Sequence, residues 1–221
     1  MKQLIEEIPL LGGTVRLLHS ALRRAAGHAF PGSLSYWEER YSTGGSSGPG
    51  SFGRSALFKA KVMNEFVASR KITSVIEFGC GDGSQLQLAE YPEYLGLDVS
   101  PTAVERCREI FKGDPRKTFK LLDEYRGEQS DLTLSIDVIF HLFEDEIFEK
   151  HMRMLFDSSA KFAIILSNNT NSNFGYGGTH VRRRRFTDWA DAHAGSFRLA
   201  EIIPGPSRLP PLLQWGQNSS F

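Results

Sequence analysis

Three glycines alternate with other residues directly after an apolar run in the stretch "SVIEFGCGDG", at Gly79, Gly81 and Gly83. Glycine lets the backbone adopt conformations closed to other residues and lets a ligand approach the main chain closely. Glu77 precedes the glycines, and Asp98 ends the next apolar run. An acid at that second place commonly accepts hydrogen bonds from ribose hydroxyls. The spacing therefore predicts a nucleoside pocket framed by two carboxylates.

The glycine spacing and the sign of the neighbouring charges favour one kind of cofactor. A dinucleotide site has the pattern G-x-G-x-x-G, with the pyrophosphate at a helix N-terminus, whereas this stretch has G-x-G-x-G. Glu77 and Asp82 would also place negative charge beside a phosphate. A nucleoside that carries an ammonium and a sulfonium group fits better, and we predict S-adenosylmethionine.

Strands and helices must alternate to position these residues. Short apolar runs typical of strands buried on both faces occur at 74–78, 94–98, 119–123, 132–136, 162–167 and 197–204. Helical patterns occur at 55–70, 84–90, 100–113, 145–156 and 187–194. This alternation predicts an α/β fold, a three-layer α/β/α sandwich around a mainly parallel sheet.

Three segments, "VIEFGCGDGSQL", "YLGLDVSPTAVERCRE" and "LTLSIDVIFHL", follow one another in this order within residues 72–167. Together they resemble the Rossmann-like class I S-adenosylmethionine-dependent methyltransferases of the small-molecule type. The resemblance implies a sheet of about seven strands with a reversed final strand. The C-terminal segment departs from that pattern because three prolines follow residue 204. We therefore expect either a sheet one strand short or a last strand that begins near Ser219 and Phe221 and lacks its remainder.

The resemblance also implies roles for single residues of this chain. Glu77 and the loop of Gly79, Cys80 and Gly81 would hold the methionine portion of the cofactor. Asp98 would bind the ribose, and Leu97 and Val99 would flank the adenosine. Asp123, which ends the third predicted strand, corresponds to a position that often binds the adenine amino group.

Asp137 and His141 lie just past the fourth predicted strand, in "SIDVIFHL". The resemblance places both at the rim that faces the donated methyl group, with Asp137 also against the cofactor. A histidine titrates near neutral pH and is a suitable base if the acceptor is a hydroxyl. The alternative is that His141 only packs beside the cofactor.

Residues 1–53 are predicted to be a helical arm with a lid loop, "STGGSSGPGSFG", before the cofactor-binding domain at 54–221. Arg40 could pair with the cofactor carboxylate, Trp37 could cover the adenosine, and Tyr41 could contact the acceptor. The alternative is that these aromatic residues only attach the arm to the core. An amphipathic helix at 15–26 would cover the domain or, alternatively, lie on a membrane surface.

Residues predicted on the acceptor side follow the last parallel strand. Asn168 and Tyr176 lie in a polar segment, and His180 precedes four consecutive arginines. We predict that these three residues, together with Arg182 and Arg185, contact the acceptor. Arginine binds carboxylate and phosphate in a bidentate way. A solvated surface run is the alternative.

The composition limits the remaining choices. The 221 residues are 40% hydrophobic. Lys+Arg and Asp+Glu both total 26, so the protein has no excess of positive charge that would favour nucleic acid as a partner. No apolar run approaches the roughly 20 residues of a membrane span, and we expect a cytoplasmic protein without a bound metal. We predict transfer of a methyl group to a polar small molecule that can carry an acid or phosphate, by O-methylation of a sugar derivative or natural-product intermediate. The alternatives are a nicotinamide-dependent oxidoreductase and a non-catalytic cofactor-binding regulatory or scaffold domain.

Overall fold

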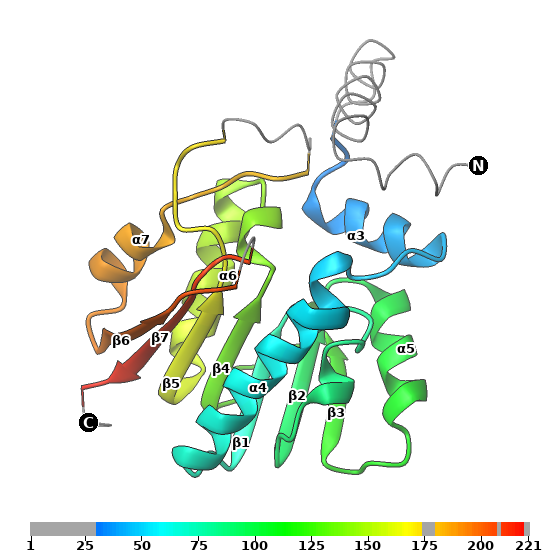
Figure 1. The fold of residues 1–221 in the computed structure, drawn as a ribbon. Helices are drawn as coiled ribbons and strands as arrows, with labels where there is room; N and C mark the ends of the chain where they lie inside the picture. Colours follow the sequence, from blue (N-terminus) through cyan, green and yellow to red (C-terminus); the bar gives the residue numbers. More distant parts are fainter. Residues whose placement is uncertain (1–29, 174–179, 207–208, 219–221) are drawn as a thin grey trace.

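The computed structural model describes residues 30–173, 180–206 and 209–218 (Figure 1). Their helices are α3 (Ser33–Ser42), α4 (Gly53–Ser69), α5 (Pro101–Phe111), α6 (Asp145–Asp157) and α7 (Phe186–His193). Short 3-10 turns are η1 (Pro49–Ser51), η2 (Leu86–Leu88), η3 (Leu122–Glu124) and η4 (Ile139–His141). The strands are β1 (Ser74–Phe78), β2 (Glu93–Asp98), β3 (Lys117–Leu121), β4 (Ser130–Ile136), β5 (Ser159–Leu166), β6 (Phe197–Ile203) and β7 (Leu212–Gln217).

The seven strands form one sheet in the order β3-β2-β1-β4-β5-β7-β6. Strands β1 to β5 pair in parallel, and β7 is antiparallel to both β5 and β6. The chain runs outward from β1 to β2 and β3 and then returns to place β4 on the other side of β1. The crevice at such a reversal of strand order, at the carboxyl ends of the strands, is where open α/β sheets bind ligands.

The expectation of an absent final strand is wrong. Leu212–Gln217 forms β7 between β5 and β6, and its leucines and Trp215 are buried. Proline has no N–H to donate to a sheet, and Pro210 and Pro211 lie just before the strand rather than inside it. The prolines therefore mark where the strand begins.

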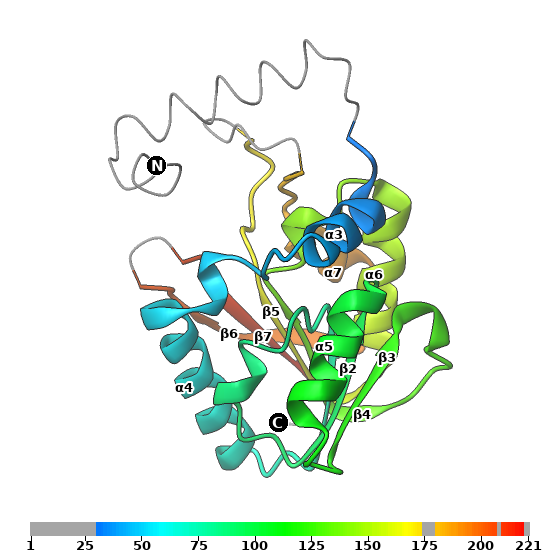
Figure 2. The same ribbon diagram turned by 90° about the vertical axis from the view of Figure 1, so that its right-hand side faces the viewer.

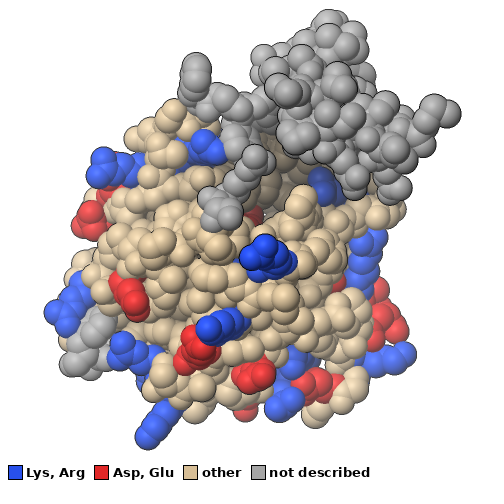
Figure 3. Space-filling view, viewed as in Figure 1, with Lys and Arg blue, Asp and Glu red and all other residues tan. Residues whose placement is uncertain are grey.

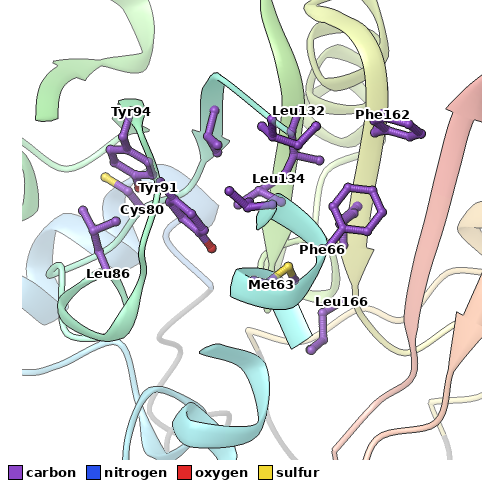
Figure 4. Packing of buried hydrophobic residues seen from close by; sticks show 14 of the residues in the cluster. Met63, Phe66, Cys80, Leu86, Tyr91, Tyr94, Leu132, Leu134, Phe162 and Leu166 are labelled. Carbon is purple, nitrogen blue, oxygen red and sulfur yellow. The ribbon is translucent and has the colours of Figure 1, made fainter. Parts of the chain in front are cut away.

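Helices cover both faces of the sheet, so the predicted three-layer sandwich is confirmed. Figure 2 shows α4 and α6 on opposite sides of the strands. On one face, Met63 and Phe66 of α4 pack against Leu132 and Leu134 of β4, and Phe66 meets the ring of Phe162 edge to face at 5.3 Å (Figure 4). On the other face, α6 and α7 bury Met152, Leu155, Phe186 and Trp189.

One predicted helix is wrong. Residues 84–90 form only the short turn η2, and Ala89 is already extended. The side chain of Asn64 accounts for this because its Nδ2 donates to the carbonyl of Leu88 at 3.0 Å and its Oδ1 accepts from the N–H of Glu90 at 3.0 Å. These backbone groups are thus satisfied without further helical turns.

The α5 start follows its sequence signals, and the end of β3 does not. Ser100 caps α5 by accepting from the N–H of Ala103 at 3.0 Å, and Pro101 occupies the first turn. Strand β3 ends at Leu121, so Asp123 lies in the turn η3 rather than at a strand end. The adenine role given to Asp123 rested on that strand end.

Acidic and basic side chains are mixed over the face of the molecule drawn in Figure 3. This pattern agrees with equal totals of 26 for Lys+Arg and for Asp+Glu. Among the described residues, no helix is both long enough and apolar enough to cross a membrane. The amphipathic segment at 15–26 lies outside the described residues, so its role stays a prediction.

Candidate active site

A cavity of about 210 Å³ opens at the carboxyl ends of β1, β2 and β4 and is also lined by residues of the arm helix α3. Most of the predicted cofactor and catalytic residues line it, together with Tyr41: Trp37, Tyr41, Glu77, Gly79, Cys80, Gly81, Asp98, Val99, Asp137 and His141. Residues 77–99 supply the floor, the loop after β4 supplies one wall, and the arm supplies the roof. The fold thus brings these three separate parts of the sequence to one site.

Each glycine of the loop after β1 has a positive φ, with values of +91° at Gly79, +59° at Gly81 and +76° at Gly83. The space beside the loop is also filled. A Cβ at position 79 would lie 2.5 Å from Cγ2 of Val138, and one at 81 would lie 2.4 Å from Oγ of Ser47. Glycine is required here both by backbone conformation and by contact with the β4 loop and the arm.

Asp98 lies buried at the end of β2, where both carboxylate oxygens accept backbone hydrogen bonds. Oδ2 accepts from the N–H of Gly81 at 2.9 Å, and Oδ1 accepts from the N–H of Ser100 at 3.0 Å. Burial raises the pKa of this carboxyl, against the lowering effect of those N–H donors. Asp98 therefore fixes the glycine loop to the end of β2 and leaves further lone pairs for ribose hydroxyls.

Glu77 is buried at the opposite end of the same loop. Its Oε2 accepts from the hydroxyl of Tyr94 at 2.6 Å. Burial raises the pKa of Glu77 to about 7, although the Tyr94 hydroxyl and the charge of Lys59 act in the opposite direction. This carboxyl changes charge near neutral pH, and a bound cation would favour its ionised form.

Lys59 of α4 is the site residue that our sequence reasoning missed most clearly. Its side chain is only 2% exposed, and its Nζ lies 2.9 Å from Oδ2 of Asp137. Asp137 has a φ of +60°, a conformation unusual for a residue with a side chain. The chain of the lid loop passes so close that a Cβ on Gly50 would lie 2.9 Å from the same Oδ2. A partly buried ion pair thus lies at the methionine end of the predicted cofactor site.

The arm is attached to the glycine loop through a reciprocal pair of hydrogen bonds. The N–H of Ser47 donates to Oδ2 of Asp82 at 2.9 Å, and the N–H of Asp82 donates to Oγ of Ser47 at 3.1 Å. Asp82 therefore serves as an anchor for the arm, and its carboxylate has a lowered pKa because the Ser47 and Ser84 donors outweigh burial, the largest single effect.

Contacts with α5 hold the arm from the other side. Glu38 accepts hydrogen bonds from the hydroxyls of Ser100 and Thr102, which lower the pKa of its carboxyl. Arg106 donates to the carbonyls of Tyr41 and Gly45. The predicted attachment of the arm therefore rests on polar contacts as well as on the aromatic residues.

His141 lies between the arm and the segment after β5. Its ring meets Trp37 edge to face at 4.8 Å and stacks on His180 at 5.4 Å, and Tyr36 stacks on the outer side of His180 at 4.7 Å. Burial lowers the pKa of His141 to about 3. Its Nδ1 lies 3.3 Å from the carbonyl oxygen of His180. Because a carbonyl can only accept, Nδ1 carries the proton and Nε2 keeps its lone pair.

Two of the predicted cofactor residues do not line the cavity. Asp123 is exposed in η3, and the neighbouring Leu122 lines the cavity instead. Arg40 donates from Nε to the carbonyl of Ser46 at 2.6 Å, and its guanidinium lies 5.5 Å from the ring centre of Trp37. Arg40 therefore orders the lid loop in this structure rather than facing the cavity.

Most of the predicted acceptor residues also lie off the cavity wall. Asn168, His180, Arg182 and Arg185 are absent from it, and Tyr176 lies outside the described residues. Arg182 and Arg184 pair with Asp145, each with an N–O distance of 2.9 Å, and Arg184 also donates to the carbonyl of Leu142. Arg185 pairs with Asp188. Arg182 and Arg184 thus attach their segment to the start of α6 and to the loop before it, which neither of the two proposed roles included.

The sequence carried weak signals for the residues that were missed. Lys59 stands in "SALFKAKVM", where its neighbours Ala56, Ala60 and Met63 are buried, so a lysine falls on the apolar face of the helix. A lysine is almost never fully buried unless it is paired. Ser47 and Glu38 gave no such signal because they fall in polar segments.

Comparisons with known proteins agree with this geometry. A family model described as a methyltransferase domain matches residues 76–160. Magnesium protoporphyrin IX methyltransferase from Synechocystis PCC 6803, with bound SAM, has a TM-score of 0.61 at 15% identity, over 86% of this chain and 100% of that chain. A comparison with curated proteins gives no match.

Two further solved structures share the fold. N-methyltransferase NodS from Bradyrhizobium japonicum WM9, in complex with S-adenosyl-L-homocysteine, has a TM-score of 0.65 at 14% identity, over 84% of this chain and 98% of that chain. Mitomycin 7-O-methyltransferase MmcR has a TM-score of 0.59 at 13% identity, over 96% of this chain and 70% of that chain. Residues 76–160 are therefore a methyltransferase domain, and the fold that contains them is that of the class I S-adenosylmethionine-dependent methyltransferases.

Proposed function

We propose that this cavity binds S-adenosylmethionine and that the enzyme transfers its methyl group to a hydroxyl of a polar small molecule. The observation that carries the choice of oxygen is His141. Its imidazole is neutral, and the carbonyl of His180 fixes the tautomer that leaves Nε2 free to accept a proton. The cofactor supplies an activated methyl group on a sulfonium centre.

The residues present fit this cofactor in three respects. The glycine loop places Gly79 and Gly81 on the cavity wall, so a ligand there meets main-chain atoms of the loop. Asp98 offers a buried carboxylate for the ribose, and Val99 and Leu122 give an apolar edge for the adenine. Glu77 and Asp137 offer negative charge to an ammonium group at the other end of the loop.

The roles of the chain follow from position and basicity. Trp37 and the remainder of the arm exclude water and orient the acceptor beside His141, which supplies part of the rate by proximity. An oxygen that has gained a methyl group is a strong acid, so an imidazole of low basicity is sufficient to accept its proton at Nε2. A neutral amine acceptor, by comparison, attacks the methyl group through its own lone pair and needs no base in that step.

The acceptor itself is proposed only as a class. The walls nearest His141 are aromatic and apolar, with Leu34, Trp37 and Leu142. The arginines that suggested an anionic acceptor are paired with Asp145, Asp188 and backbone carbonyls, so they give that choice no support. A hydroxylated ring, either a sugar derivative or a natural-product intermediate, fits walls of this kind.

The test combines product analysis with a variant of His141. The enzyme, S-adenosylmethionine and a set of methyl glycosides, phenols and matched amines are incubated together, and methylated products are identified by mass spectrometry. With an active hydroxyl acceptor, His141→Ala should lower kcat by about 100-fold or more and leave the Kd of S-adenosylhomocysteine within about threefold. His193→Ala, at an exposed position on α7, is the control. Methylation of amines alone, or unchanged kcat in His141→Ala, would exclude the proposed role.

A further inference from the structure

Lys59 is the buried cation of the cavity. Among the described residues, two lysines line the cavity, and the other, Lys150, is exposed on α6. Lys59 Nζ has three N–H donors, and within the described part of the chain it makes one hydrogen bond, to Oδ2 of Asp137 at 2.9 Å. A buried ammonium group is costly unless its hydrogen bonds are made, so its remaining donors are suited to a ligand.

Glu77, Asp137 and Lys59 form a small charged group at one end of the glycine loop. The charge of Lys59 acts on Glu77, and its ammonium contacts Asp137 directly. With both acids ionised, the group carries one net negative charge. The amino-acid end of S-adenosylmethionine has one ammonium and one carboxylate, and its sulfonium adds one positive charge. The ligand and the three side chains are therefore complementary both in net charge and in the kinds of charge present.

We propose that Lys59 binds the α-carboxylate of the cofactor, while Glu77 and Asp137 receive its ammonium group. This assignment replaces Arg40, whose guanidinium is engaged with Ser46 and Trp37 outside the cavity wall. It rests on the proposed cofactor site and names the residue that distinguishes a cofactor with a carboxylate from one without it.

The test uses two ligands that differ only in the carboxylate: S-adenosylhomocysteine and its decarboxylated analogue, 5′-(3-aminopropylthio)-5′-deoxyadenosine. Calorimetric Kd values give the preference for the carboxylate as a ratio. A charged hydrogen bond predicts a ratio of about 10- to 100-fold in the native enzyme. In Lys59→Met the ratio should fall below about threefold, with the Kd of the amine analogue largely kept.

Matched variants locate the effect. Lys61→Met removes an exposed lysine from the same helix and should keep the native ratio, as should Arg40→Met. An unchanged ratio in Lys59→Met, or its loss in Arg40→Met instead, would overturn the assignment while leaving binding of S-adenosylhomocysteine intact. Absence of binding by the native enzyme would instead reject the cofactor site itself.

Removal of a buried cation can unfold a domain, so a second variant keeps Lys59 in place. Asp137→Asn removes the competing carboxylate and weakens ammonium binding equally for both ligands. The ratio between them should therefore stay at the native value or increase. A ratio near one in Asp137→Asn would overturn the role of Lys59 without any change at Lys59 itself.

Discussion

The hydrogen bond from Tyr94 on β2 and the charge of Lys59 on α4 favour the ionised form of the Glu77 carboxyl. The negative charge of Asp98 opposes it. Burial outweighs the hydrogen bond and the lysine, so the pKa rises from 4.5 to about 7. The folded chain thus holds a proton between these two values that the unfolded chain has lost. The free energy of unfolding therefore decreases as the pH rises through this window.

Affinity for the cofactor should change with pH in the opposite sense, because an ammonium group needs the ionised carboxylate. We expect the Kd of S-adenosylhomocysteine to rise as the pH falls below about 7, by up to about tenfold per unit. Glu77→Gln should bind weakly and show little change between pH 5.5 and 8. Calorimetry over this range checks the prediction, and the same slope in both proteins would assign the titration to another group.

The arm and the glycine loop contact each other, and residues of both line the cavity. Ser47 lines the cavity, accepts from the N–H of Asp82 and donates its own N–H to the carboxylate of that residue. Arg106 of α5 adds hydrogen bonds to the carbonyls of the arm. The arm therefore depends on the same loop that is proposed to bind the cofactor.

Ser47→Ala should loosen the arm because it removes the hydroxyl that accepts from Asp82, at a cost of about 0.5 to 1.5 kcal/mol. Cleavage by trypsin after Arg54, an exposed residue beside the lid loop, should become faster by a few fold and slow again when S-adenosylhomocysteine is bound. Ser42→Ala, at an exposed position whose hydroxyl bonds only within α3, serves as control. Equal cleavage of the three proteins would contradict this coupling.

At the scale of the whole molecule, the reversed strand β7 joins the last helix to the sheet. Trp215 is 2% exposed and meets Phe156 of α6 edge to face at 5.8 Å and Phe186 of α7 at 6.1 Å. It thus connects two helices through one strand. The site lies at the carboxyl ends of β1, β2 and β4, which are neighbours in the interior of the same sheet.

Trp215→Ala should lower the free energy of unfolding by about 3 to 5 kcal/mol, the usual cost of removing a large buried aromatic side chain. Urea denaturation of the two proteins measures the difference. Leu199→Ala, at a position 39% exposed on the neighbouring strand β6, should cost about 1 kcal/mol or less. A loss below about 1 kcal/mol for Trp215→Ala would show that β7 contributes little to the core.

The sequence allowed the order of strands and helices and the framing of the glycine loop to be predicted because these depend on local patterns. The apolar runs, the glycine spacing and the cap at Ser100 all act over a few residues. Lys59 meets Asp137 from 78 residues away, and the arginines find Asp145 from about 40 residues away. Such pairings depend on how elements pack, and local sequence patterns do not show this. The prolines before β7 led to the wrong expectation of an absent last strand for the same reason, because the pairing of β7 with β5 and β6 is also a contact between distant segments.

Gly81 has a consequence for how related sequences can change. Its missing side chain is the space into which Ser47 fits, since a Cβ there would lie 2.4 Å from the serine oxygen and 3.0 Å from the hydroxyl of Tyr41. Besides the positive φ of +59°, a side chain at 81 therefore also needs a different lid loop. In a set of relatives, we expect positions 47 and 81 to vary jointly, so that the arm and the cofactor loop are inherited as a pair.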